Sequence, residues 1–179
     1  MNQVRVRFRK SDLLGRGGFC IVMATVERTV DIAASPETVW SIIADPSYLP
    51  KLVPDLISNE VDPPGVAAVG QKGHALGKIA GRRVDIFTEV TEVQPNKKLA
   101  FSQRPGGLFK SFSNTVTLTP TKTGTRATQT TKYEPSLGYL GKVLSSLVVS
   151  RSIEKNAKAF LTNTKEIAEL KEMPKPSAG

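Results

Sequence analysis

The sequence predicts an α+β domain: one antiparallel sheet of seven strands, two short helices after the first strand, and a long helix near the C-terminal end. Three observations predict this class. Seven segments are typical of strands, and residues that favour turns separate them. No helical pattern interrupts the last six segments, which favours antiparallel pairing. Within residues 137–171, apolar side chains recur at helical spacing. The sheet and the long helix must either pack tightly or enclose a cavity.

The first strand and the two short helices have strong local signals. Residues 26–32 alternate, with a period of two that predicts a strand with one buried face. Ser35 is a favourable N-cap, and Pro36 follows it at the first helical position, where a missing N–H costs nothing. The first helix should end at Asp45-Pro46, because the residue before a proline avoids the helical conformation. Residues 47–52 are expected to form the second short helix.

The other six strands are predicted from their boundaries. Each ends at a cluster of proline, glycine, asparagine or threonine residues, such as Asp62-Pro63-Pro64-Gly65. The expected strands are residues 56–61, 70–78, 82–93, 98–104, 108–119 and 125–133.

The long helix has two apolar stripes that are out of phase. Leu140, Leu144, Leu147 and Val148 form one stripe, and the series from Ile153 through Phe160 to Ile167 forms the other. Either the helix breaks near residues 149–152, or its first half is apolar on a second side. We predict a break or a separate segment at residues 136–149. Such a segment would cover the mouth of a cavity or touch a membrane, although packing on the sheet is the commoner arrangement.

Composition excludes several classes of protein. The chain has 179 residues and an ordinary balance of hydrophobic and charged side chains, which fits one domain. One cysteine, Cys20, excludes an internal disulfide, and one histidine, His74, excludes a histidine-rich metal cluster. No apolar run is long enough to span a bilayer, and no secretory signal pattern is present. We therefore expect a cytoplasmic protein.

The two ends of the chain differ from the middle. Residues 1–22 hold five basic residues and one acid, out of a net charge of +9. They are interpreted as a dispensable extension or mis-assigned start, with a basic arm for an anionic partner or a targeting peptide as alternatives. Residues 23–173 are expected to form the ligand-binding domain. Residues 174–179 are expected to be a flexible tail.

Several stretches resemble a known superfamily. TVDIAASPETVWSIIADPSYLPKLVP is similar to the opening of the START-like (SRPBCC) superfamily and its polyketide cyclase/dehydrase family, which includes coenzyme Q-binding members. VGQKG, GRRVDIFTEVTEVQPNKKLAFS and NTVTLTPTKTGTRATQTTKYEPS resemble its middle strands, and LGYLGKVL and LTNTKEIAELKE its closing helix. The resemblance covers about residues 25–172. It implies a helix-grip fold, in which a curved sheet wraps around the C-terminal helix over a deep cavity.

The alternation of side chains along each strand predicts which residues face that cavity. Taking the more apolar face of each strand as the inner one gives mostly apolar residues with scattered hydrogen-bonding groups, a mixture typical of ligand cavities. His74 shares a face with Leu76, although its strand is ambiguous. The predicted ligand-binding residues are Arg28, Ile86, Thr88, Phe101, Gln103, Phe112, Asn114, Gln129, Thr131, Tyr133, Leu140 and Leu144.

The function that these features favour is binding of a small hydrophobic ligand, such as a lipid, a quinone or a polyketide-like aromatic, by a carrier or sequestering protein. An aromatase/cyclase or dehydratase using the same cavity is the alternative, with His74 or Tyr133 as the acid/base candidate. No catalytic residue is assigned. Nucleotide loops, metal-ligand clusters and nucleophile elbows are absent from the sequence, so we expect no metal and no cofactor.

The partners expected from the sequence are few. A small hydrophobic ligand is the main one, and no specific nucleic acid is expected. A third hypothesis gives the chain a macromolecular partner at a membrane or a ribosome, through transient contact of its basic surface. The sequence leaves the oligomeric state open.

Overall fold

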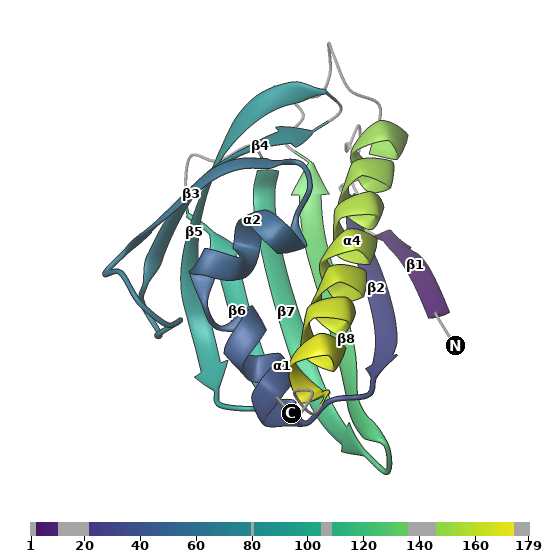
Figure 1. Ribbon diagram of the computed structural model, residues 1–179. Helices are drawn as coiled ribbons and strands as arrows, with labels where there is room; N and C mark the ends of the chain where they lie inside the picture. The colour runs from purple at the N-terminus through teal and green to yellow at the C-terminus, as the bar shows by residue number, and fades with distance from the viewer. Residues whose placement is uncertain (1–2, 11–21, 80, 105–108, 136–145, 174–179) are drawn as a thin grey trace, which may run out of the picture.

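The computed structural model describes residues 3–10, 22–79, 81–104, 109–135 and 146–173. Figure 1 shows one curved sheet that wraps around a long helix. The strands are β1 (Gln3–Lys10), β2 (Val22–Ile32), β3 (Leu56–Asp62), β4 (Lys72–Ile79), β5 (Arg82–Gln94), β6 (Lys98–Gln103), β7 (Phe109–Thr121) and β8 (Gly124–Pro135). The helices are α1 (Pro36–Ile43), the 3-10 turn η1 (Pro46–Tyr48), α2 (Leu49–Leu52) and α4 (Ser146–Glu172). None of the helices among the described residues is long and apolar enough to span a membrane.

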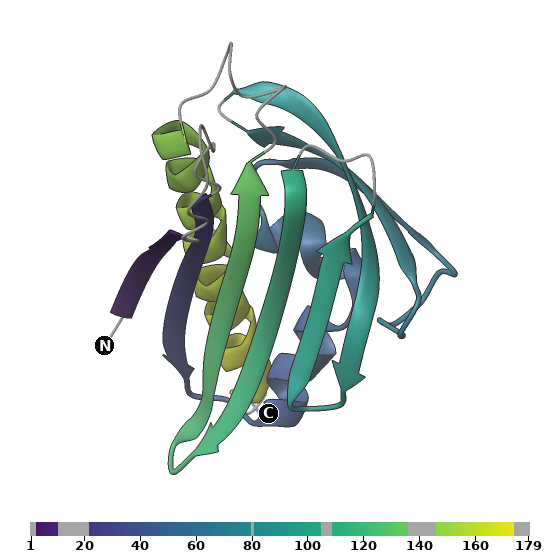
Figure 2. The ribbon, with the colours of Figure 1, turned by 180° about the vertical axis from the view of Figure 1, so that it is seen from behind.

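The sheet has the strand order β1-β2-β8-β7-β6-β5-β4-β3, and all neighbouring strands are antiparallel. The seven strands β2 to β8 confirm the predicted sheet and its order along the chain. β1 extends the sheet at the edge of β2, within the basic segment that was expected to be an extension. From behind, Figure 2 shows the sheet as a layer that α4 and the short helices cover on one side only.

The short helices begin and end where the sequence predicts. The Ser35 side chain accepts a hydrogen bond from the Thr38 N–H at 3.2 Å, and Pro36 is the first helical residue. The Asp45 side chain accepts from the Ser47 N–H at 2.9 Å and so caps η1. Val39 and Ile42 are fully buried. These contacts fix α1 and η1 at one end of the sheet, beside the C-terminal end of α4 (Figure 1).

The long helix runs without interruption from Ser146 to Glu172, so the predicted break near residues 149–152 is wrong. Val149 and Ser150 are both buried, although they are neighbours on the helix. Phe160 and Leu161 in the second half are likewise neighbours and both buried, so the helix is covered on more than one row of side chains in both places. Residues 136–145, in which most of the predicted separate segment falls, lie outside the described residues.

The buried apolar side chains form two clusters. The larger one, which we call the α1-end core, joins α1, the C-terminal half of α4 and β2, β7 and β8, and it includes Ile32, Ile42 and Phe160. The smaller one, the α4-start core, surrounds Tyr133, Val149 and Ile153. α4 runs from one cluster to the other, so it holds both ends of the sheet together.

The C-terminal half of α4 is also attached to the end of β2 by polar contacts. The Glu169 carboxylate accepts from the Ala33 N–H at 2.8 Å and from Lys165 Nζ at 2.8 Å. These hydrogen bonds, that from Lys165 first, lower the pKa of Glu169 below its usual value. Lys165 also donates to the carbonyl oxygen of Asp31 at 2.7 Å.

Gly124 is expected to be essential for the β7–β8 hairpin. Its φ is +143°, and a Cβ at this position would clash with the backbone of Ile32 and Ala34. Gly124→Ala should lower the free energy of unfolding by about 3 kcal/mol or more, from backbone strain together with the clash. Urea unfolding curves would measure this change.

Gly65→Ala is the matched control, because Gly65 has a φ of +121° but no atom lies within 4 Å of the position that its Cβ would take. This variant should have the backbone strain without the clash, so it should lower the free energy of unfolding by about 1–3 kcal/mol. Equal losses in the two variants would contradict the role of the clash at Gly124.

Candidate functional site

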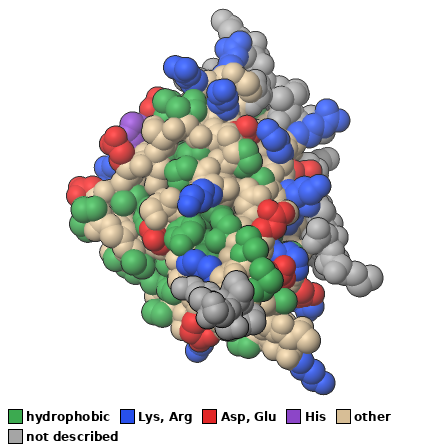
Figure 3. Space-filling model, in the orientation of Figure 1, with side chains coloured by type: hydrophobic (Ala, Val, Ile, Leu, Met, Phe, Trp, Pro, Cys, Tyr) green, Lys and Arg blue, Asp and Glu red, His purple; other side chains and the backbone are tan. Residues whose placement is uncertain are grey.

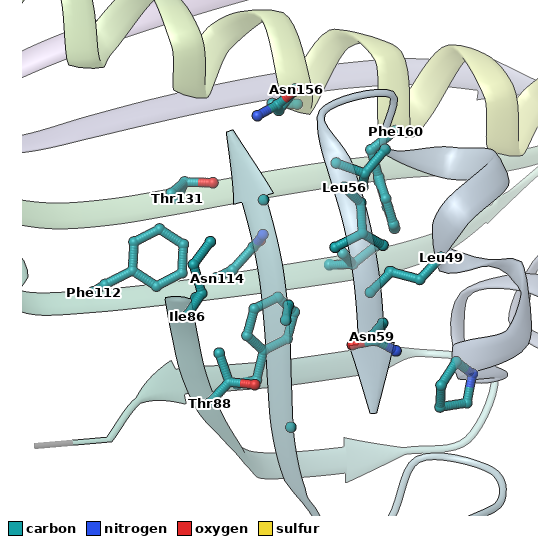
Figure 4. A pocket seen from close by; sticks show the side chains of 18 of the residues that line it. Leu49, Leu56, Asn59, Ile86, Thr88, Phe112, Asn114, Thr131, Asn156 and Phe160 are labelled. Carbon is teal, nitrogen blue, oxygen red and sulfur yellow. The ribbon is translucent and has the colours of Figure 1, made fainter. Parts of the chain in front are cut away.

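A cavity of about 260 Å³ lies between the sheet, α4 and the short helices. Its walls are mainly apolar, and β3 to β8, η1, α2 and α4 all contribute to it. Leu49 of α2 and Leu56 of β3 line one side of it, and Phe160 projects into it from α4 (Figure 4). The cavity lies between the two apolar cores, since Val116 and Phe160 of the α1-end core and Phe109 and Ile153 of the α4-start core all line it.

Small side chains on β4 leave room for this cavity. Gly73, Ala75 and Gly77 line it from alternate positions, which makes them the inner face of β4. A Cβ at Gly73 would lie 2.6 Å from Thr88 Oγ1 on the neighbouring strand. A larger residue at position 73 would therefore require the Thr88 side chain to move.

Seven of the predicted ligand-binding residues line the cavity. They come from four consecutive strands, which the antiparallel register brings side by side. The seven are Ile86, Thr88, Phe101, Phe112, Asn114, Gln129 and Thr131. Leu140 and Leu144 lie outside the described residues.

Three predicted residues lie elsewhere, and their expected position in the cavity is corrected. Arg28 is half-buried on the inner face of β2, opposite Gln129, but it does not line the cavity. The Gln103 amide is engaged by the backbone of Phe109, donating to its oxygen at 2.7 Å and accepting from its N–H at 3.2 Å. Tyr133 is buried in the α4-start core, where its hydroxyl shares a 2.6 Å hydrogen bond with Ser150 Oγ.

Burial raises the pKa of the Tyr133 phenol above its usual value, and the hydrogen bond with Ser150 opposes that shift. The hydroxyl is therefore a protonated structural group. Its ring packs edge-on against Phe109 at 5.7 Å between centroids. Both contacts are those of a core residue.

His74 lies on the outer surface, which corrects its placement as an acid/base candidate beside the cavity. Its Nε2 is 2.8 Å from Asp85 Oδ1, and its ring stacks on Phe87 at 4.5 Å. The apolar-face rule gave His74 the face of Leu76 but left this strand ambiguous, because the rule gives no weight to glycine and alanine. The alternation Gly73, Ala75, Gly77 is the signal that could have identified the true inner face.

Sequence reasoning also missed Asn156, which extends from α4 toward the strands that carry Asn114 and Thr131 (Figure 4). It is three residues after Ile153 and four before Phe160, so helical spacing places it on the inward stripe. A polar residue within this otherwise apolar stripe was the sequence signal that could have identified Asn156 as part of the cavity wall.

Three carboxamide oxygens at the cavity wall lack partners. Asn114 Oδ1, Gln129 Oε1 and Asn156 Oδ1 are buried and have no hydrogen-bond partner among the described residues. A buried polar atom without a partner costs about 1–3 kcal/mol. A ligand that donates hydrogen bonds to these oxygens would recover that free energy.

Charged groups contribute little to the wall. Asp55 lines the cavity, but both of its carboxylate oxygens are 3.1 Å from Lys155 Nζ. Lys72 and Lys78 also line it and are exposed. In the described part of the chain, no group of three or more His, Cys, Asp or Glu side chains could hold a metal ion.

Polar contacts hold the elements that close the cavity. Asn163 Nδ2 of α4 donates to the carbonyl oxygens of Lys51 and Leu52 at 3.1 and 3.2 Å, which fixes α2 against α4. The Gln71 side chain donates to the carbonyl oxygen of Pro63 at 2.7 Å and ties the loop between β3 and β4 together.

The surface on the side of α2 is chemically mixed. Figure 3 shows hydrophobic side chains with Lys and Arg side chains spread among them rather than gathered into one patch. This distribution does not mark one strongly basic area on that face.

Known proteins share both the sequence pattern and the fold. A family model described as polyketide cyclase/dehydrase and lipid transport matches residues 23–169. No curated protein sequence matches the chain. Among solved structures, the Zhui aromatase/cyclase from Streptomyces sp. R1128 superposes with a TM-score of 0.71, at 20% identity over 88% of this chain and 99% of that one.

Two further structures have the same fold. The protein TTHA0849 from Thermus thermophilus is 23% identical over 84% of this chain and 99% of that chain, with a TM-score of 0.67. A START superfamily protein from Mycobacterium smegmatis is 19% identical over 83% of this chain and 96% of that chain, with a TM-score of 0.59. At these identities the likeness concerns the fold alone.

Tyr133→Phe tests the structural role of the tyrosine hydroxyl. The variant should lose about 1–2 kcal/mol of unfolding free energy, because Ser150 loses its partner in a buried place. Urea unfolding measures the loss. Tyr48→Phe is the control, because Tyr48 is half-buried and its hydroxyl makes no hydrogen bond within the described part of the chain. The free energy of unfolding of this variant should stay within about 0.5 kcal/mol of that of the unmodified protein. An unchanged stability for Tyr133→Phe would contradict this role.

Proposed function

The chain belongs to the polyketide cyclase/dehydrase and lipid transport family, and from this we propose that it binds one small hydrophobic molecule in the cavity between the sheet and α4. It would act as a carrier or sequestering protein. The observation that carries the proposal is the cavity itself, with apolar walls and a few convergent hydrogen-bonding groups. Such a combination is typical of small-molecule sites.

The size of the cavity supports a compact ligand. Its volume of about 260 Å³ is just below the roughly 300–1000 Å³ typical of ligand pockets. A fused aromatic system or a short acyl chain would fill the cavity, whereas a lipid with two long chains is too large to fit. Apolar burial would supply the driving force, at about 25 cal/mol for each Å² removed from water.

Binding is favoured over cyclase or dehydratase chemistry by the positions of the acid/base candidates. General acid/base catalysis needs a side chain within hydrogen-bonding reach of the reacting atom. His74 is on the outer surface and Tyr133 is held in the α4-start core by Ser150. Among the described residues that line the cavity, the titratable ones are Asp55, Lys72 and Lys78.

Native mass spectrometry of the purified protein, compared with the denatured sample and an organic extract, tests the proposal. We expect a co-purifying molecule of defined mass, or binding of one member of a lipid and quinone panel. An empty protein that binds none of the panel would contradict the proposal. Binding that follows the basic surface and weakens with salt would support the macromolecular-partner hypothesis instead.

Two neighbouring substitutions on β5 separate cavity binding from surface binding. Ile86 lines the cavity, whereas Phe87 is exposed on the opposite face of the strand. Ile86→Trp should fill part of the cavity and lower ligand affinity by about tenfold or more, which corresponds to about 1.4 kcal/mol. Phe87→Trp should leave the affinity unchanged. Equal effects of the two substitutions would place the ligand outside the cavity.

A further inference from the structure

We infer that the wall of the cavity formed by Asn114, Gln129, Thr131 and Asn156 is a subsite for an uncharged hydroxyl group, an alcohol or a phenol, on the ligand. The inference rests on the proposed function and adds the chemistry of one end of the ligand. We call these four residues the carboxamide subsite.

The fold brings the four side chains to one place. Asn114 on β7 is directly opposite Thr131 on β8, and Gln129 is two residues from Thr131 on the same face. Asn156 reaches toward them from α4 (Figure 4). Two strands and one helix therefore contribute polar groups to the same wall of the cavity.

The hydrogen-bonding state of the subsite indicates the kind of group it would take. Three of its carboxamide oxygens are buried without partners among the described residues. They need donors, which a ketone, an ether or a quinone oxygen cannot supply. A hydroxyl group donates through its hydrogen and also accepts from an amide N–H, so it complements a carboxamide in both directions.

The subsite is also electrically neutral. Its four side chains are amides and one hydroxyl. The nearest cation in the sheet register is Arg28, which lies directly opposite Gln129 and whose buried Nε has no hydrogen-bond partner among the described residues. Arg28 is not part of the cavity wall. A carboxylate or phosphate held by these four side chains would lose its hydration without gaining a counter-charge from the cavity wall, which is costly. The subsite should therefore select an uncharged group.

An aromatic frame suits the position next to the subsite. Phe101 lies opposite Asn114 on β6, and Phe112 is two residues before Asn114 on the same face of β7. Aromatic rings pack favourably on such side chains. A fused aromatic alcohol is therefore a suitable probe.

The test compares four probes of one shape by isothermal titration calorimetry: naphthalene, naphthol, the methyl ether of naphthol, and naphthoate. Naphthol should bind about tenfold or more tightly than naphthalene and than the ether, which accepts but cannot donate. Naphthoate should bind less tightly than naphthol. Equal affinities for naphthol, ether and naphthalene would overturn the inference while leaving the proposed function in place. Tighter binding of naphthoate would overturn the neutrality of the subsite.

Two substitutions on different elements assign the preference to the subsite. Asn114→Leu on β7 and Asn156→Leu on α4 keep the approximate size of the side chain and remove its hydrogen-bonding groups. In each, the ratio of naphthol to naphthalene affinity should fall to within about threefold, a difference of about 0.6 kcal/mol. Thr117→Leu, on the exposed face of β7, should keep the ratio of the unmodified protein.

The outcomes separate this inference from the proposed function. A ratio that survives in both asparagine variants would overturn the subsite, although cavity binding would stand. If none of the four probes binds the unmodified protein, both the subsite and the proposed aromatic ligand class are overturned. A lipid that binds the unmodified protein and is lost in Ile86→Trp would then support the proposed function alone.

Discussion

The division of the core into two clusters is the constraint on which the rest of this structure depends. The α1-end core and the α4-start core each bury a compact set of apolar side chains, and α4 passes through both. The cavity lies between these two clusters, and residues of both line it. Packing at the two ends supports the space between them, so the protein does not need to fill its centre to be stable.

Local features keep that space open and give it its chemistry. The inner face of β4 carries Gly73, Ala75 and Gly77, which leave room where larger residues would close the gap. Asn163 and the Lys155–Asp55 pair hold α2 and the start of β3 against α4, so the cavity has a second wall. The carboxamides of the opposite wall then sit in an enclosed place, where each missing hydrogen bond matters more than it would in water.

The strands, turns and short helices could be predicted because their signals are local: Ser35 and Pro36 begin α1 whatever the rest of the fold does. Side-chain placement was less predictable. Alternation identifies the two faces of a strand but does not tell a cavity from a core, so Tyr133 was grouped with Thr131, although only Thr131 lines the cavity. The face of the strand that carries His74 was ambiguous from the sequence because two glycines and an alanine form the inner face of β4. The continuity of α4 through Val149 depends on which of its faces other elements cover, and that is a tertiary property.

Isoleucine methyl groups offer the most direct test that the cavity binds the ligand. Ile43, Ile79, Ile86 and Ile153 line it from α1, β4, β5 and α4, whereas Ile57 and Ile167 do not. In methyl NMR spectra of isoleucine-labelled protein titrated with naphthol, the account predicts saturable shifts at the four lining residues and none at the two others. Shifts at the exposed Ile57 without shifts at Ile86 and Ile153 would place the ligand on the surface and contradict the account.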